Sequence, residues 1–327
     1  MVTHANNVRA QVALLINSAR SVPEAVWCEF TPEQQRQALN VYVQKIEQLI
    51  SDELPLAIAR DESDVIFHAE GPALKPSKYR LAAFNSVVDA VNGSILELVA
   101  GNLAKLGPSD MSLRMAKQQV AIELSGLAPG SLFVGAKVTV ANKAELFDKD
   151  MLREDIDSIL QALPQAASFV KGEQIDSEIQ DAIVDPFLRD SALIAACSIA
   201  PTGKRGVDSV TIFPKEGIGV SNVVLTPTKR QVIRQTIRQG GIGDRVASAK
   251  IEGVVREVNL DTRRFLVRSS EGILVRCFLK GLDKQKASGL LGQKVSVSGA
   301  GEKDKEGRMR FVSLESDPII LQSTTNS

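Results

Sequence analysis

The sequence predicts an α+β protein of several domains, and three observations lead to this prediction. The chain has 327 residues, which is too long for one small core at roughly 100 to 200 residues per domain. Apolar residues recur at helical spacing as far as Lys117, whereas short runs rich in Val and Leu appear beyond Gly126. Helical segments and strands then alternate before a final run of strands, an order typical of the α+β class.

Composition excludes several classes of protein. A hydrophobic fraction of 44% with 24% charged residues is ordinary for a globular protein and excludes disordered and collagen-like chains. Cys28, Cys197 and Cys277 are odd in number and far apart, which argues against a disulfide framework. The N-terminus has no basic region followed by an apolar run, and no segment is predicted to enter a membrane. We therefore expect a cytoplasmic protein.

Charge is distributed unevenly, although 39 basic and 39 acidic residues cancel over the whole chain. The chain as far as Thr228 holds 20 basic and 28 acidic residues, and the part from Lys229 holds 19 and 11. The two parts therefore carry charges of −8 and +8. Two interpretations remain open: the basic end binds a partner or nucleic acid, or the two ends neutralise each other within the molecule or across a homodimer.

Residues 1–125 are predicted to form a helical region. A helix starts after Thr31, with Pro32 at its first position, and apolar residues as far as Ile50 give this helix an apolar face. The stretch from Pro55 to Pro76 is rich in acidic residues, glycine and proline, and its composition predicts a connection. A long helix is predicted from Tyr79 to Lys105, packed in a bundle with the earlier helices.

Residues 126–227 are predicted to form an α+β domain. The dense apolar run from Leu132 to Val140 follows the turn signal Pro129–Gly130 and indicates a buried strand. Further helices are expected at Lys149–Leu163, Gln174–Ile183 and Asp185–Cys197, and further strands at Ser209–Phe213 and Gly219–Leu225.

Residues 228–245 are predicted to form a basic helix and a glycine linker. The helix runs from Lys229 to Gln239, and every fourth residue is an arginine, which places Arg230, Arg234 and Arg238 on one face. The glycines Gly240, Gly241 and Gly243 predict a flexible joint.

Residues 246–321 give the clearest architectural pattern, and residues 322–327 form a polar tail. Five strands are expected at Ile251–Val258, Arg263–Ser269, Ile273–Leu279, Gln293–Ser298 and Met309–Leu314. The first turn is expected at Asp261–Thr262, and a short helix, Leu282–Leu291, lies between the third and fourth strands. This order predicts a five-stranded OB-like β-barrel, an architecture that often binds oligonucleotides or oligosaccharides.

The basic charge of this end makes nucleic acid a candidate ligand, either RNA or single-stranded DNA. The candidate phosphate contacts are seven arginines: Arg230, Arg234, Arg238, Arg263, Arg264, Arg268 and Arg276. Base stacking on such a barrel also needs exposed aromatic rings. Phe265, Phe278 and Phe311 each lie inside a predicted strand, where filling the barrel is the favoured interpretation.

The same segment carries a resemblance to a known group of proteins. Its residues are Asp261, Arg263, Phe265 and Val267, then Glu271, Gly272, Val275, Arg276 and Cys277, and later Lys294, Val295, Val297, Gly299, Gly307 and Arg308. This pattern resembles the small β-barrel that closes many bacterial antitoxin-like and uncharacterised accessory proteins. The middle region, with Pro129, Gly130, Ser131, Phe133 and Val134, is similar to proteins that carry such a barrel. The resemblance implies a non-enzymatic protein with a protein partner, such as a toxin or a defence-system effector.

Signals for catalysis, metal binding and cofactors are sparse. His4 and His68 have no cysteine at metal-ligand spacing, and His68 is expected in a surface loop. Gly203, Lys204 and Arg205 lack the first glycine and the final Ser or Thr of a phosphate-binding loop, which favours a solvent loop. The acidic residues from Asp148 to Asp157 are explained by the start of a helix. We predict no catalytic residue, no metal and no cofactor.

The sequence therefore predicts a cytoplasmic, non-enzymatic accessory or antitoxin-like protein. Its acidic part would engage a protein partner, and its OB-like end would bind nucleic acid or the same partner. The main alternative is a single-stranded nucleic-acid binding protein, and a homo-oligomer also stays open. A hydrolase is the third hypothesis.

Overall fold

The structure, a computed structural model, describes residues 3–75, 78–106, 112–128, 132–140, 149–215, 221–238, 242–260, 263–304 and 306–321. The predicted turns Pro129–Gly130 and Asp261–Thr262, the glycines Gly240 and Gly241, Asp148, the start of the strand predicted at Gly219–Leu225 and the tail 322–327 lie outside these ranges. The chain forms two compact units. Unit 1 comprises residues 1–94, 122–139 and 198–230, and unit 2 comprises residues 95–121, 140–197 and 231–327. The residues of the two units therefore alternate along the chain.

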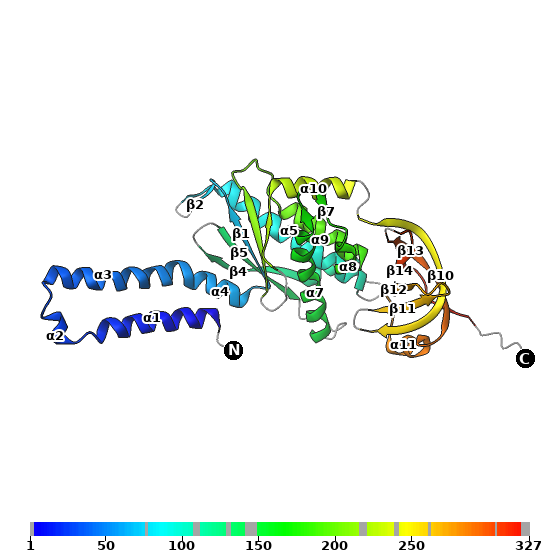
Figure 1. Ribbon diagram of the computed structural model, residues 1–327, viewed down its shortest axis with the longest axis horizontal. Helices are drawn as coiled ribbons and strands as arrows, with labels where there is room; N and C mark the ends of the chain where they lie inside the picture. The colour runs from blue at the N-terminus through cyan, green and yellow to red at the C-terminus, as the bar shows by residue number, and fades with distance from the viewer. Residues whose placement is uncertain are drawn as a thin grey trace, which may run out of the picture. The chain divides into compact units, whose positions relative to one another are not determined.

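Unit 1 begins with a helical arm, which is formed by the first helices of the chain. These elements are α1 (His4–Arg20), α2 (Glu24–Trp27), α3 (Pro32–Gln48), a π-helical turn η1 (Leu49–Glu53) and α4 (Leu54–Glu62). The predicted start of α3 is confirmed, since Thr31 and Gln34 form a reciprocal capping box ahead of Pro32. Helices α1 and α3 lie side by side (Figure 1).

The base of the arm is held by a small apolar core and by one carboxylate. Ala5 and Val8 of α1 are buried against Leu49 and Ala57. The carboxylate of Asp61 accepts hydrogen bonds from the backbone N–H groups of His4 at 2.9 Å and Ala5 at 2.8 Å. The start of α1 therefore contacts the end of α3 and helix α4, so α1 and α3 are antiparallel.

The sheet of unit 1 has the strand order β4-β5-β1-β8-β9. Its strands are β4 (Val120–Ala128), β5 (Leu132–Val140), β1 (Val65–Glu70), β8 (Ser209–Pro214) and β9 (Val223–Leu225). The strands predicted at Leu132–Val140 and Ser209–Phe213 are confirmed.

The central strand β1 corrects the expectation that Pro55–Pro76 is a connection. This stretch contains helix α4 and strand β1, and β1 pairs antiparallel with both β5 and β8. Asp64 belongs to the acidic run that suggested a loop, but its buried carboxylate accepts the backbone N–H of Val138 at 2.8 Å. The acidic residue therefore fixes the entry of the chain into the sheet.

Several helices follow the arm in the chain. They are α5 (Leu81–Leu106), α6 (Leu113–Gln119), α7 (Lys149–Ser168), α8 (Ile179–Ala182), α9 (Pro186–Ile199) and α10 (Pro227–Arg238). Two short hairpins accompany them, β2 (Leu74–Lys75) with β3 (Lys78–Tyr79) and β6 (Val170–Lys171) with β7 (Gln174–Ile175). The helix predicted at Gln174–Ile183 is wrong over its first half, because Gly172 with φ +58° makes a turn into the β6–β7 hairpin.

Helix α5 is the one described helix that is long and apolar enough to cross a membrane, judged by length and composition alone. Half of its apolar window, Leu81–Lys105, is buried inside the protein. Asn102 on this helix is buried and donates hydrogen bonds to Leu98 O at 2.7 Å and Ser191 Oγ at 3.0 Å. This partial burial is consistent with a core helix.

The C-terminal strands of unit 2 confirm the predicted element order. They are β10 (Asp244–Asn259), β11 (Arg264–Ser269), β12 (Leu274–Phe278), β13 (Lys294–Lys303), β14 (Met309–Leu314) and a short β15 (Ile319–Ile320), with helix α11 (Lys284–Leu290) after β12. The pairings run from β10 through β11, β12, β14 and β13 back to β10, and only β12–β14 is parallel. Phe265, Val267, Val295 and Val312 are among the buried residues inside this ring of strands.

Candidate binding surfaces and the charged cluster around Arg189

Two of the seven predicted phosphate-contacting arginines make internal contacts. The Arg230 guanidinium donates to Ser198 O at 3.2 Å and Ala200 O at 2.6 Å, carbonyls at the end of α9. Arg264 pairs with Asp185, with 3.3 Å between the guanidinium nitrogen and the carboxylate oxygen. Acceptors within the protein therefore already bind both guanidinium groups.

The other five predicted arginines lie on different elements. Arg263 is half-buried in the turn before β11, where it adopts φ +51°, and burial lowers its pKa while Asp155 opposes the shift. Arg234 and Arg238 are exposed on α10. Arg268 and Arg276 are exposed on the outer face of β11 and β12.

Arg268 and Arg276 share this outer face with apolar side chains. The strand register places Arg268 opposite Leu274 and Arg276 opposite Leu266. Leu274 is exposed on this face. The face therefore alternates arginine and leucine across two neighbouring strands.

The three phenylalanines of the C-terminal strands are all buried. Phe265 lies in the core inside the ring of strands, as the sequence predicts. Phe278 makes a cation–π contact, since the Lys105 ammonium lies 4.9 Å from its ring centroid. Phe311 is also buried. None of these rings is available for base stacking.

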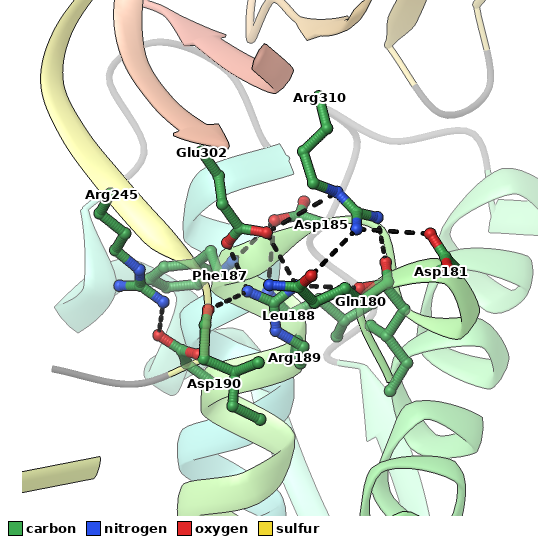
Figure 2. Close-up of polar contacts among 12 residues, drawn as sticks. Gln180, Asp181, Asp185, Phe187, Leu188, Arg189, Asp190, Arg245, Glu302 and Arg310 are labelled. Atoms are coloured by element: carbon green, nitrogen blue, oxygen red, sulfur yellow. Dashed lines mark hydrogen bonds and ion pairs between the residues drawn. The ribbon is translucent and has the colours of Figure 1, made fainter. Parts of the chain in front are cut away.

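A buried cluster of charged residues joins the C-terminal strands to α8 and α9. The Arg189 side chain is fully buried, and Glu302 is 1% exposed. Arg189 Nη1 donates to Glu302 Oε1 at 3.2 Å, and a second hydrogen bond joins Nη2 to Oε2. Figure 2 shows Glu302 between the guanidinium groups of Arg189 and Arg310. The Glu302 carboxylate therefore pairs with both Arg189 and Arg310.

Arg189 and Arg310 also bind groups outside this pair. Arg189 Nη2 donates to Ile242 O at 2.8 Å. Arg310 Nη1 lies 3.4 Å from both Gln180 Oε1 and an Asp181 carboxylate oxygen. Gly243, predicted as part of a flexible joint, has φ +98°, and a Cβ there would lie 2.7 Å from the Glu302 carboxyl carbon. A side chain at position 243 would therefore collide with the Glu302 carboxyl group, and the positive φ also favours glycine there.

Asp185 organises a second group of charges at the start of α9. Its Oδ1 lies 3.3 Å from the Lys105 ammonium and accepts the Phe187 N–H at 2.9 Å. Its Oδ2 lies 3.3 Å from Arg264. Burial alone would raise the pKa of Asp185, but Lys105, Arg264 and the helix N–H groups lower it. Burial lowers the pKa of Lys105, against the attraction of Asp185.

A cavity of about 220 Å³ adjoins Asp185. Lys105, Asp155 and Arg264 line it together with amide side chains of α7. Lys105 and Arg264 already share Asp185, and the volume lies below the roughly 300 to 1,000 Å³ of most ligand pockets. We therefore assign these groups a structural role.

These contacts explain part of the charge split along the sequence. Basic side chains of the C-terminal part pair with acidic side chains of residues 181–190: Arg245 with Asp190, Arg264 with Asp185 and Arg310 with Asp181. The two ends of the chain thus neutralise each other in part within the molecule, one of the alternatives that the sequence leaves open.

Replacing Asp185 with asparagine should destabilise the protein in a pH-dependent way. The folded pKa is lowered, so the stabilisation exists above the unfolded value near 3.9 and is lost as pH falls through the folded pKa. We expect a loss of about 2 kcal/mol at pH 7 that shrinks below about pH 4. Thermal unfolding of both proteins between pH 3 and pH 8 measures this, and a pH-independent difference would contradict it.

His68 and the described acidic residues of α7 lie in regular secondary structure and contact neighbouring side chains. His68 lies in strand β1 rather than a loop, stacked on Phe133 with centroids 3.9 Å apart. Burial lowers its pKa and Glu70 opposes the shift. On α7, Asp157 pairs with Arg153 at 2.9 Å. No group of three His, Cys, Asp or Glu that could hold a metal ion occurs among the described residues.

The loop at Gly203 is a solvent-exposed turn. Gly203 and Gly206 adopt φ +74° and +72°. Lys204 and Arg205 are exposed and line a surface hollow with Arg80 at the start of α5.

The arm carries a surface that the sequence prediction missed. None of the described residues of α3 is buried. Leu39, Val43 and Ile50 have 41%, 47% and 50% of their surface exposed, and Ile16 of α1 has 37%. The signal was present in the sequence, because the apolar residues of α3 occupy more of the helix than one neighbouring helix can cover.

No family model, no curated protein and no solved structure matches this chain.

Proposed function

We propose that this chain is a non-enzymatic accessory protein, antitoxin-like in role, that binds a protein partner through its helical arm. The observation that carries the proposal is the apolar surface of α3, which no described part of the chain covers. Exposed apolar patches of this kind mark protein interaction sites in folded proteins. The proposed activity needs no cofactor, and the expected location is the cytoplasm.

Co-purification tests this function. The products of the genes beside the coding sequence are each co-expressed with the full chain and also expressed alone. The proposal expects one product to co-purify and to arrest growth when it is expressed without this protein. If every neighbouring product is harmless and fails to co-purify, the accessory function is wrong.

A second candidate function is the binding of single-stranded nucleic acid. We infer that strands β10 to β14 form an OB-type barrel, since the pairing order and the place of α11 are those of that architecture. The outer face of β11 and β12 carries Arg268 and Arg276 beside exposed Leu274. Such a face would contact phosphates without base stacking.

Removing both arginines should weaken binding to a fluorescein-labelled 15-nucleotide oligothymidine. We expect the Arg268→Gln/Arg276→Gln variant to bind about tenfold more weakly at low salt, with a shallower salt dependence. Arg114→Gln is the control, because Arg114 is exposed on helix α6, outside the C-terminal strands. Fluorescence anisotropy at several salt concentrations measures both effects. Equal losses in the two variants, or no binding by the unmodified chain, would contradict this second function.

A further inference from the structure

Helix α3 and the turn η1 that continues it present two adjacent apolar stripes. The first includes Ala38, Tyr42 and Leu49, and it faces α1, since Leu49 is buried in the core at the base of the arm. The second consists of Leu39, Val43, Ile46 and Ile50, at spacings of four, three and four residues. This is the spacing of a helix that packs against another helix along a coiled-coil seam. The first stripe packs against α1. In the second stripe, Leu39, Val43 and Ile50 are exposed, and Ile46, at the border with the first stripe, is half-buried.

The second stripe continues onto α1. Successive helical residues are about 100° apart, so each residue that follows an inward-facing one lies on one flank of its helix. Because α1 and α3 are antiparallel, these flanks lie on the same side of the arm. The flank includes Ile16, which follows Leu15 of α1, and Val43, which follows Tyr42 of α3. Together they make one face, which we call the arm face.

The charges on the arm face are mainly positive. Arg9 follows Val8 and Arg20 follows Ala19 on α1, and Arg36 follows Gln35 on α3. Glu47 is the one acidic residue at an equivalent position, and α1 contains no acidic residue. All four charged side chains are exposed. An apolar stripe bordered by three arginines and one glutamate favours a partner of negative charge.

Building on the proposed function, we propose that the arm face binds an amphipathic helix of the partner protein whose apolar stripe is flanked by acidic residues. From Leu39 to Ile50 the seam is about 16 Å long, which matches roughly three turns of a partner helix. A second copy of the chain fits less well. A twofold interface would bring the same face, with its net positive border, against itself.

A designed peptide pair tests the chemistry of the partner. The first peptide has 21 residues with leucine at heptad positions a and d and glutamate at the flanking positions, and the second replaces each glutamate with lysine. Self-repulsion keeps both peptides monomeric. We expect the glutamate peptide to bind the full chain and to gain helix, and the lysine peptide to bind about fivefold to tenfold more weakly at low salt, since each exposed ion pair contributes little.

Two matched variants locate the site. Val43→Glu places a charge in the seam and should weaken binding of the glutamate peptide at least about tenfold. Val41→Glu makes the same change on the same helix, but Val41 is 66% exposed and lies on the opposite side. It should change the affinity less than about twofold. Circular dichroism checks that both variants fold alike.

The outcomes separate this proposal from the proposed function. Equal binding of the two peptides, or equal effects of the two variants, overturns the acidic-helix proposal. Sedimentation that shows a dimer abolished by Val43→Glu overturns it in favour of a second copy. If a neighbouring gene product co-purifies with the Val43→Glu variant as strongly as with the unmodified chain, both the arm-face proposal and the arm-based function fail. If the Val43→Glu variant no longer co-purifies with that product but the chain binds both peptides equally, the proposed function holds and only the proposal of an acidic partner helix fails.

Discussion

Replacing Arg189 with alanine is expected to lower the free energy of unfolding by about 3–5 kcal/mol. The Arg189 side chain is fully buried and holds the carboxylate of Glu302, which is itself 1% exposed. Its removal leaves Glu302 buried with only Arg310 nearby, at 3.8 Å. For a unit of this size the loss should lower Tm by on the order of 10 °C, which differential scanning calorimetry measures.

Arg245→Ala is the matched control for this prediction. Arg245 forms an ion pair with Asp190, but its side chain is 44% exposed. Exposed pairs contribute about 1 kcal/mol or less, so Tm should change by only a few degrees. Equal shifts in the two variants would show that the buried cluster does not hold the C-terminal strands to α9.

Gly299→Ala is the second change with a large expected effect. A Cβ at this position of β13 would lie 2.0 Å from the Ser313 carbonyl oxygen and 3.0 Å from Leu314 Cα, both on β14. Backbone atoms cannot move aside as a flexible side chain can, so the two strands must separate locally. We expect a loss of about 3 kcal/mol, measured by denaturant unfolding.

The control for Gly299→Ala is the same substitution inside a helix. An added Cβ at Gly93 of α5 meets no atom within 4 Å. Alanine there should stabilise the protein by about 0.5–1 kcal/mol, because glycine loses more backbone freedom on folding. The account of β13 and β14 is wrong if Gly299→Ala is as well tolerated as Gly93→Ala.

The C-terminal strands could be predicted from the sequence because their signals are local. Buried Phe265 and Val267 alternate with less buried residues along β11, and Gly272 and Gly307 mark turns at φ +82° and +78°. Each of these features is visible within a few neighbouring positions. The element order therefore follows from short-range pattern alone.

Strand β1 could not be predicted in the same way. It is the central strand of its sheet, and Val65, Ile66 and Phe67 are all buried. A strand buried on both faces shows no alternation of apolar and polar residues. Its partners β5 and β8 are distant in sequence, and the acidic residues before it have the composition of a loop.

The role of the arginines depended on contacts that sequence cannot supply. Arg264 and Arg268 lie on the same side of β11, yet Arg264 reaches Asp185, 79 positions away, and Arg268 is exposed. The pairing of Arg189 with Glu302 spans 113 positions. Periodicity assigns a face to each side chain but does not say what covers that face.

Partner binding through the arm is tested by comparing two double variants in co-purification with the neighbouring gene product. Val43→Glu/Ile50→Glu changes the arm face, whereas Leu14→Glu/Val41→Glu places the same charges on α1 and α3 at side chains that are each 66% exposed and lie away from that face. We expect the first variant to lose the partner and the second variant to retain it. Retention by both variants would contradict partner binding through the arm.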